Sequence, residues 1–158
     1  MSLEESDFFS LMGTIELVCE LGEDGSRFSE LEEELSFVMS HQTLITRIEQ
    51  GKEAGIIESR TVSEGSSTSH KYFLTDIGSA YLDFLTNIGL ESLYQDVKQV
   101  YKEFNPRREK AQRFLSEYPI HMYDKYGIEE HGYDIEYQTP TELWEAFLSG
   151  DIGEGKNE

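Results

Sequence analysis

The side chains best suited to chemical recognition lie close together between positions 41 and 47: His41, Gln42, Thr43, Thr46 and Arg47. A glutamine can form two hydrogen bonds with adenine, an arginine can do the same with guanine, and a threonine can contact the thymine methyl group or a phosphate. Presented together by one helix, these groups match the base edges in the major groove of double-stranded DNA. The alternative interpretation is that they form only the solvated side of a helix.

A helix that begins after Ser40 would present these groups on one side. Ser40 is a good N-cap because its hydroxyl can accept a hydrogen bond from a backbone N–H one turn ahead. The other side of this helix is predicted to be buried, since apolar or small residues recur there at helical spacing: Leu44, Ile45, Ile48 and Gly51. Gly55 is placed to end the helix in the left-handed conformation. Ser40, at the helix start, joins the predicted DNA contacts.

A β-hairpin is predicted directly after this helix. Residues 56–62 and 70–74 read as strands, the polar run 63–69 as the loop between them, and Thr75 as the cap of the next helix. Arg60 and Lys71 lie at the base of the hairpin, where we expect them to contact phosphates. The loop carries hydroxyl groups and Glu64 but no base. A wing that binds in the minor groove usually has a basic residue at its tip, so we expect this tip to add little specificity.

Four sequence blocks resemble a pattern shared by the HxlR, PadR and MarR-type regulators. The pattern reads F-S-E-L, S-x-x-T-L-x-x-R-L, E-x-A-G-L-I and Y-x-L-T-x-x-G, and its counterparts here are residues 27–31, 40–48, 53–57 and 71–78. The blocks occur in order and at the right separations. The resemblance covers about residues 8–86. It implies a DNA-binding transcription regulator of the α+β class, mainly helical, with a winged helix-turn-helix, a two-stranded wing and a C-terminal helical extension.

Two helices are expected before the predicted recognition helix. The first would run from an N-cap at Asp7 to Leu21, with its apolar residues at three- and four-residue steps. The second would be capped by Ser29, with Glu32 completing a capping box and Leu31 and Leu35 pointing inward. Cys19, late in the first helix, is interpreted as a small buried hydrophobe rather than a redox-sensing thiol, because the sequence shows no resolving cysteine and no adjacent cation.

A dimer helix is predicted after a break at residues 87–89. Its apolar positions follow a heptad spacing. We expect them to form a homodimer, with packing against the first helix as the alternative: Leu90, Leu93, Val97, Val100 and Phe104. Asn105 and Pro106 have the form of a cap and first position, so a second helix is expected to begin there. The predicted domains are residues 1–86, 87–118 and 119–158.

The C-terminal part of the chain combines a basic cluster with an aromatic tail. The cluster is read either as a clamp on the DNA backbone or as a solvated helix face: Lys98, Lys102, Arg107, Arg108, Lys110 and Arg113. In the tail, Thr139 and Glu142 form a capping box for a helix over 140–149, with Pro140 at its first position. We expect this helix to pack on the body or on the other protomer. A pocket for a small-molecule effector or a surface for a partner is the alternative.

The net charge of −19 is unusual for a DNA-binding protein. Residues 1–35 hold eleven acids and one base, residues 36–86 hold six acids and four bases, and residues 87–158 hold fifteen acids and eight bases. The predicted reading region is therefore the least acidic part. One explanation is a halophilic source such as a salt-adapted archaeon, because salt screens self-repulsion. The rival explanation is a winged-helix protein-interaction module of a transcription complex that does not itself bind DNA.

Several classes of function lack support in the sequence. No nucleophile elbow, phosphate-binding glycine loop or helical metal motif occurs, so we expect no enzyme, cofactor or metal site. His121 and His131, near Glu129 and Glu130, have too loose a spacing to indicate a metal. No apolar run is long enough for a membrane span. The single cysteine rules out an internal disulfide and fits a reducing cytoplasm.

Overall fold

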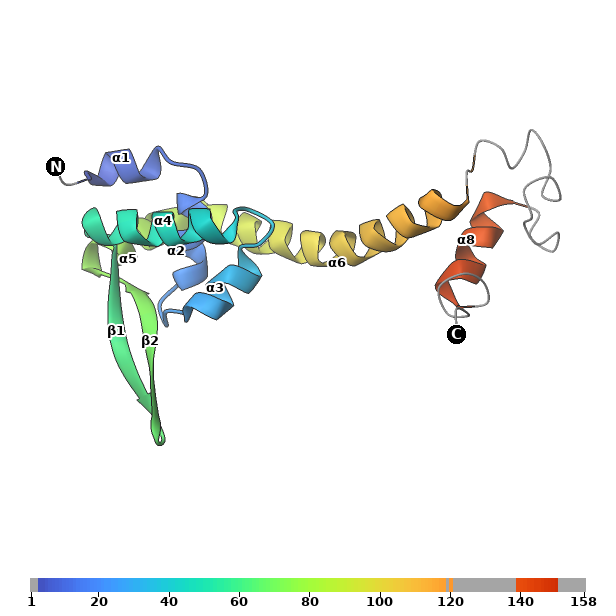
Figure 1. Ribbon diagram of the computed structural model, residues 1–158. Helices are drawn as coiled ribbons and strands as arrows, with labels where there is room; N and C mark the ends of the chain where they lie inside the picture. The colour runs from blue at the N-terminus through green and yellow to red at the C-terminus, as the bar shows by residue number, and fades with distance from the viewer. Residues whose placement is uncertain (1–2, 119, 121–138, 151–158) are drawn as a thin grey trace. The chain divides into compact units, whose positions relative to one another are not determined.

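The structure is a computed structural model that describes residues 3–118, 120 and 139–150. It is mostly helical with one two-stranded antiparallel sheet, which confirms the predicted fold class (Figure 1). Its elements in chain order are α1 (Glu5–Phe9), α2 (Thr14–Leu21), α3 (Phe28–Glu34), α4 (His41–Glu53), β1 (Ile57–Glu64), β2 (Ser67–Leu74), α5 (Asp76–Asn87), α6 (Leu90–Glu117) and α8 (Pro140–Leu148). The chain divides into two compact units, Met1–Tyr101 and Lys102–Glu158. The sequence-based boundaries at 86 and 118 stay predictions.

The predicted recognition helix forms as α4. Ser40 Oγ accepts a hydrogen bond from the Thr43 N–H at 3.2 Å, and Gly55 follows the helix with a φ of +78°. Leu44 and Ile48 are buried, and Gly51 lets the helix pack closely on the side chain of Ile57. Ile45 is a correction to the predicted buried side, because 37% of its surface is exposed.

The wing is longer and more regular than predicted. The register runs from Ile57 opposite Leu74 to Glu64 opposite Ser67, so the strands continue almost to the tip. Only Gly65 and Ser66 separate them, and the φ of +63° at Gly65 suits a type II′ turn. The predicted loop over residues 63–69 is wrong because side chains exposed on both faces leave no apolar alternation for the sequence to reveal.

An isolated antiparallel β-bridge between Ser26 and Tyr72 supports the base of the wing. The Ser26 N–H donates to the Tyr72 carbonyl at 2.9 Å, and the Tyr72 N–H donates to the Ser26 carbonyl at 2.8 Å. Helix α3 begins directly after this bridge. Its N-cap is Arg27, whose N–H donates to Glu30 Oε1 at 3.0 Å, so the predicted cap at Ser29 is wrong by two positions. The earlier start follows from the pairing of Ser26, which ends the extended segment at Arg27.

The core of the first unit draws on α1 to α6. Its fully buried apolar side chains include Phe8, Leu17, Val18, Leu21, Leu31, Leu35, Leu44, Ile48 and Ile56. The predicted single helix over residues 7–21 is wrong, because the chain breaks between Phe9 and Thr14 and Gly13 adopts a φ of +87°. A residue with a side chain would be strained in that conformation. The break lets α1 pack against α5, where the rings of Phe9 and Tyr81 lie 4.5 Å apart.

Helix α6 runs through the position where a second helix was expected to begin. Gly89, with a φ of +80°, separates α5 from α6 as predicted. Pro106 then lies inside α6, so the predicted restart at Asn105 is wrong. A proline in a helix interior removes one backbone hydrogen bond but does not always end the helix.

The second unit buries a small aromatic cluster. Thr139 Oγ1 accepts from the Glu142 N–H at 3.1 Å and caps α8, as predicted. Leu143 and Phe147 are buried against Phe114 of α6, with Trp144 and Tyr118 at the edge of the cluster. The predicted helix therefore packs on the end of its own α6. The remaining tail tyrosines (Tyr123, Tyr126, Tyr133 and Tyr137) and the pair His121 and His131 with Glu129 and Glu130 lie outside the described residues.

One member of the predicted basic cluster is inside the first unit. Lys98 Nζ lies 2.6 Å from Glu20 Oε1 of α2 and 3.5 Å from Glu34 Oε2 of α3. Tyr94 donates from its hydroxyl to the same oxygen of Glu20 at 2.7 Å. Burial acts to lower the pKa of Lys98, but the hydrogen bonds and charges of Glu20 and Glu34 together outweigh burial, so that pKa is raised. Lys98 thus fastens α6 to two other helices, which excludes it from a DNA clamp.

Cys19 lies beside this cluster and is 5% exposed, as expected of a small buried hydrophobe. Burial raises the pKa of its thiol to about 12, and the charges of Glu91, Glu16 and Glu20 act in the same direction. The thiolate is the reactive form of cysteine, so a thiol that stays protonated at neutral pH is poorly suited to redox sensing.

Candidate DNA-binding surface

The first turns of α4 expose most of the predicted base-reading side chains. His41, Gln42 and Thr46 are exposed, and Thr43 is half-buried. Two hydroxyls are held locally, since Thr46 Oγ1 donates to the Gln42 carbonyl at 3.0 Å and Ser40 Oγ donates to Thr43 Oγ1 at 3.0 Å. Their oxygens can still accept hydrogen bonds. The Gln42 amide and the Thr46 hydroxyl are therefore presented together on the outer side of the helix.

His41 is fixed by contacts with α3. Its Nδ1 forms an ion pair with a carboxylate oxygen of Glu32 when the ring is protonated, and its ring meets the edge of Phe28 at 5.3 Å between centroids. These contacts hold the start of α4 against α3. The side chain of His41 is 60% exposed, so the ring stays accessible at the outer surface.

Arg47 points away from Gln42 and Thr46. Its Nε donates to the Met12 carbonyl at 2.9 Å, and its Nη1 donates to Gln50 Oε1 at 3.1 Å. The guanidinium is thus tied to the segment between α1 and α2. A contact with guanine would require Arg47 to give up these two hydrogen bonds, and that contact stays a prediction.

The two faces of the wing differ in character. Because side chains alternate along a strand, Ile57, Ser59 and Thr61 share a face with their partners Tyr72 and His70. Ile57 packs against Gly51 of α4, and Tyr72 lines a groove together with Ile45 and Ile48 of α4. Sequence reasoning missed Ser59, Thr61 and His70 as candidate DNA contacts, although alternation from the apolar Ile57 could have placed them on the α4 side.

The predicted phosphate contacts Arg60 and Lys71 lie on the opposite face of the wing. They are cross-strand neighbours, and both cover the ring of Phe73, with Arg60 Cζ 4.4 Å and Lys71 Nζ 5.4 Å from its centroid. Arg60 also forms an ion pair with Glu58. The structure therefore does not bring these two residues together with the exposed side of α4.

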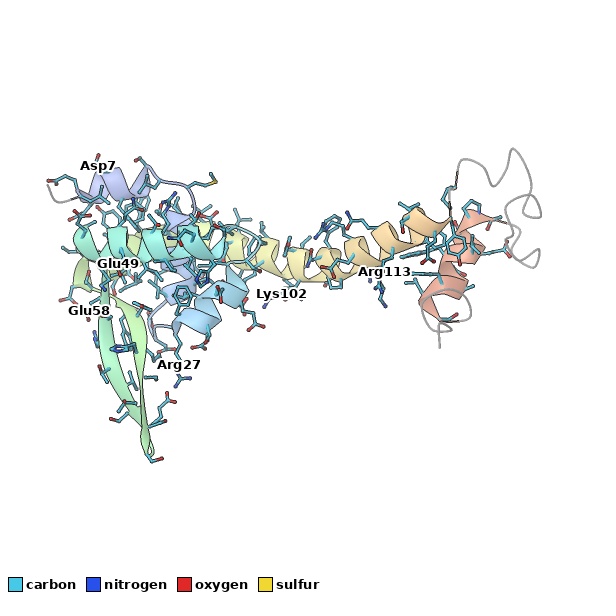
Figure 2. All side chains as sticks on the ribbon, viewed as in Figure 1. Asp7, Arg27, Glu49, Glu58, Lys102 and Arg113 are labelled. Carbon is cyan, nitrogen blue, oxygen red and sulfur yellow. The ribbon has the colours of Figure 1, made fainter. Side chains whose placement is uncertain are left out.

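Carboxylates accompany most cations on the winged helix. The exposed ion pairs of the described residues there are Arg27 with Glu64, His41 with Glu32, Lys52 with Glu49, and Arg60 with Glu58. Figure 2 labels Arg27, which precedes α3, Glu49 of α4 and Glu58 of β1. Exposed pairs of this kind contribute under about 1 kcal/mol, so a phosphate can replace the carboxylate at little cost. The surface is locally neutral rather than basic.

The comparison with protein families decides among the families that the sequence suggested. Residues 13–99, more than half of the chain, match the model described as HxlR-like helix-turn-helix. The chain belongs to this family. The HxlR-like chain is accordingly a DNA-binding transcription regulator, and its matched region extends from the start of α2 into α6.

Other comparisons add little to this assignment. A search of curated proteins found no match for the HxlR-like chain. Among solved structures it is similar to the crystal structure of diamide-treated YodB from B. subtilis, with 22% identity and a TM-score of 0.42 over 63% of this chain and 90% of that one. At that level the likeness carries no argument about function. Within the described residues, no helix is long and apolar enough to cross a membrane, and no group of three metal-ligating side chains occurs.

Proposed function

We propose that this HxlR-like regulator reads specific sequences in double-stranded DNA by placing α4 in the major groove. The observation that carries the proposal is the joint exposure of Gln42 and Thr46 on the first turns of a capped helix. The wing beside α4 adds hydroxyl groups for phosphate contacts on its α4 side. Ser40, His41 and Thr43 complete the proposed contact set, with Arg47, Arg60 and Lys71 as candidates that must first change partners.

The test is selection of bound sequences from a random duplex library over a series of KCl concentrations. The wild type is expected to enrich one motif. The Gln42→Ala variant is expected to lose discrimination at one adenine of that motif by roughly tenfold, because a bidentate glutamine–adenine contact is lost. Gln112→Ala is the matched control, since Gln112 is an exposed glutamine on α6. An identical motif and affinity in Gln42→Ala would exclude α4 as the reader.

A homodimer is part of the proposal, because paired half-sites suit a two-fold symmetric regulator. The apolar side chains Leu93, Val97, Val100 and Phe104 of α6 are 56–63% exposed, and Phe84 of α5 and Ile88, which directly follows α5, are also exposed. Leu90, the first residue of the predicted heptad, is partly packed on the core. A run of exposed apolar residues of this extent is typical of an interface.

The Val97→Asp variant is expected to sediment as a monomer and to bind the selected duplex at least about tenfold more weakly, since a charge would have to be buried at the interface. Gln99→Asp is the control because it adds the same charge at an exposed position of the same helix. Sedimentation velocity decides the matter. Equal sedimentation of Val97→Asp and the wild type would remove α6 from the proposed interface.

A protein-interaction module is the second candidate function. It is favoured by the net charge of −19 and by the ion-paired cations of the winged helix. In that case the folded protein would enrich no duplex at any KCl concentration. Enrichment that persists at molar KCl would instead support salt adaptation as the reason for the acidity.

A further inference from the structure

Two exposed side chains on α4 have no role in the proposed contact set. They are Ile45, which is 37% exposed, and Glu49, whose side chain is 65% exposed. Residues four apart lie on the same side of a helix, one turn above the other. Both also lie within the turns that follow Gln42 on the outer side of α4. Figure 2 labels Glu49 on this helix.

These two side chains border a shallow groove of about 240 Å³ at the junction of α4, α3 and the wing. Its lining is mainly apolar and aromatic, with one carboxylate and one phenol hydroxyl: Phe28, Ile45, Ile48, Glu49 and Tyr72. The Glu49 carboxylate lies 3.3 Å from Lys52 Nζ one turn further along the helix. The groove therefore combines an apolar wall with one exposed carboxylate, that of Glu49.

The chemistry of this pair matches pyrimidine bases. In the major groove, cytosine presents an N4 amino group, to which a carboxylate can be the acceptor, and thymine presents a methyl group, which packs on apolar side chains. Guanine and thymine present oxygen acceptors at the corresponding position of the major groove. An ionised carboxylate is also an acceptor, so it cannot form a hydrogen bond with them. Four helical residues advance by about 6 Å, close to two base-pair steps. The two side chains can therefore reach neighbouring positions of one site.

The same carboxylate acts against binding at random sequence. A phosphate that approaches α4 without a cytosine amino group in place is repelled by the Glu49 carboxylate, because the exposed pair with Lys52 offsets that charge only weakly in water. Specificity is a difference of affinities, and repulsion from the wrong partner contributes to it. An acidic residue in the reading surface is thus useful to a regulator that must reject most DNA.

We propose that Ile45 and Glu49 are specificity-determining residues of α4. Glu49 selects cytosine by accepting a hydrogen bond from its N4 amino group, and Ile45 selects thymine through its methyl group. The proposal rests on the proposed function, because it has meaning only if α4 enters the major groove.

The test of Glu49 repeats the library selection with Glu49→Gln and with Glu53→Gln as a control. Glu53 is an exposed glutamate on the same helix, one turn further from the N-terminus. Glu49→Gln is expected to lose roughly tenfold of the preference for cytosine at one position and to bind random duplex more tightly. Glu53→Gln is expected to keep the wild-type preference at every position. A cytosine preference that is unchanged in Glu49→Gln would overturn the role of Glu49.

The test of Ile45 uses the selected duplex with each thymine replaced in turn by deoxyuridine, which lacks only the methyl group. The wild type is expected to bind one of these duplexes several-fold more weakly, whereas Ile45→Ala is expected to bind it and the thymine duplex equally. If the wild type does not distinguish the two bases anywhere, the role of Ile45 is wrong.

Different results would exclude major-groove binding by α4 and the roles of Ile45 and Glu49. A wild type that enriches no motif would remove the proposed function, and this proposal with it. A wild type that enriches a motif that responds to Gln42→Ala but not to changes at Ile45 or Glu49 would remove this proposal alone. The Glu49 side chain is mostly exposed, so Glu49→Gln is expected to keep the thermal unfolding midpoint of the wild type. Ile45→Ala truncates a partly covered apolar side chain and is expected to lower that midpoint slightly.

Discussion

Replacing Lys98 with methionine is expected to lower the free energy of unfolding of the first unit by about 3 kcal/mol. Only 15% of the Lys98 side chain and 9% of the Glu20 side chain are exposed. Methionine retains the apolar volume but leaves the carboxylate of Glu20 buried without its cation. The loss is large because the desolvation of that carboxylate is no longer offset. It also loosens α6, which Lys98 and Tyr94 hold against α2.

Urea unfolding followed by far-ultraviolet circular dichroism measures this effect. Lys52→Met is the control, since the pair of Lys52 with Glu49 is exposed and should change stability by only a few tenths of a kcal/mol. The single tryptophan, Trp144, lies in the second unit and reports the unfolding of that unit by fluorescence. Equal stability of Lys98→Met and Lys52→Met would show that the buried cluster does not hold α6.

Replacing Gly78 with alanine is expected to destabilise the first unit by about 3 kcal/mol. An alanine in a helix interior ordinarily stabilises a protein relative to glycine by roughly 0.5–1 kcal/mol. Here the added Cβ would overlap the carbonyl oxygen of Ile56 and approach Leu74 Cβ at 3.1 Å. A backbone oxygen cannot move aside as a flexible side chain can, so the strain outweighs the gain in helix propensity.

The Gly78 position also connects α5 to the end of α4. Thr75 Oγ1 accepts from the Gly78 N–H at 3.1 Å and donates to the carbonyl of Gly55, which follows α4. We therefore expect Gly78→Ala to weaken DNA binding as well as stability. Thermal unfolding of Gly78→Ala is compared with that of Ser79→Ala, the next position on α5, which should be neutral within a few tenths of a kcal/mol. A rise in stability on Gly78→Ala would contradict the close packing described for α5.

The sequence predicted those parts of the fold that depend on local signals. Ser40, Thr75 and Thr139 cap helices as expected, because a cap needs only a hydroxyl and a backbone N–H three residues away. Gly55 ends α4 because left-handed backbone favours glycine. These signals are complete within a few residues. They could therefore be identified without knowledge of the tertiary structure.

The breaks in helices were harder to predict. The apolar spacing continues from Phe8 to Val18 across a break, because both short helices bury residues in the same core. Conversely, Asn105 and Pro106 have the form of a helix start, but the preceding helix continues through them. A local pattern shows that a helix can begin at a residue; it does not show whether another helix ends there.

For the candidate DNA-binding surface, too, the sequence predicted the features that depend on local spacing and missed those that depend on long-range contacts. The exposure of Gln42 and Thr46 follows from helical spacing within α4. The engagement of Arg47 by the Met12 carbonyl joins residues 35 apart in sequence, and no local pattern reveals it. The placement of Arg60 and Lys71 on the far face of the wing depends on which face packs against α4. The partners of Lys98 likewise come from helices far away in sequence.

Major-groove binding by α4 is tested by dimethyl sulfate protection of the selected duplex. The reagent methylates guanine N7, which faces the major groove. If α4 lies in that groove, the wild-type protein should protect guanines in two half-sites about 10 base pairs apart. At the same protein concentration, Gln42→Ala should lose this protection. Bound duplex whose guanines react as in free DNA would contradict major-groove reading by α4, as would the absence of binding at every KCl concentration.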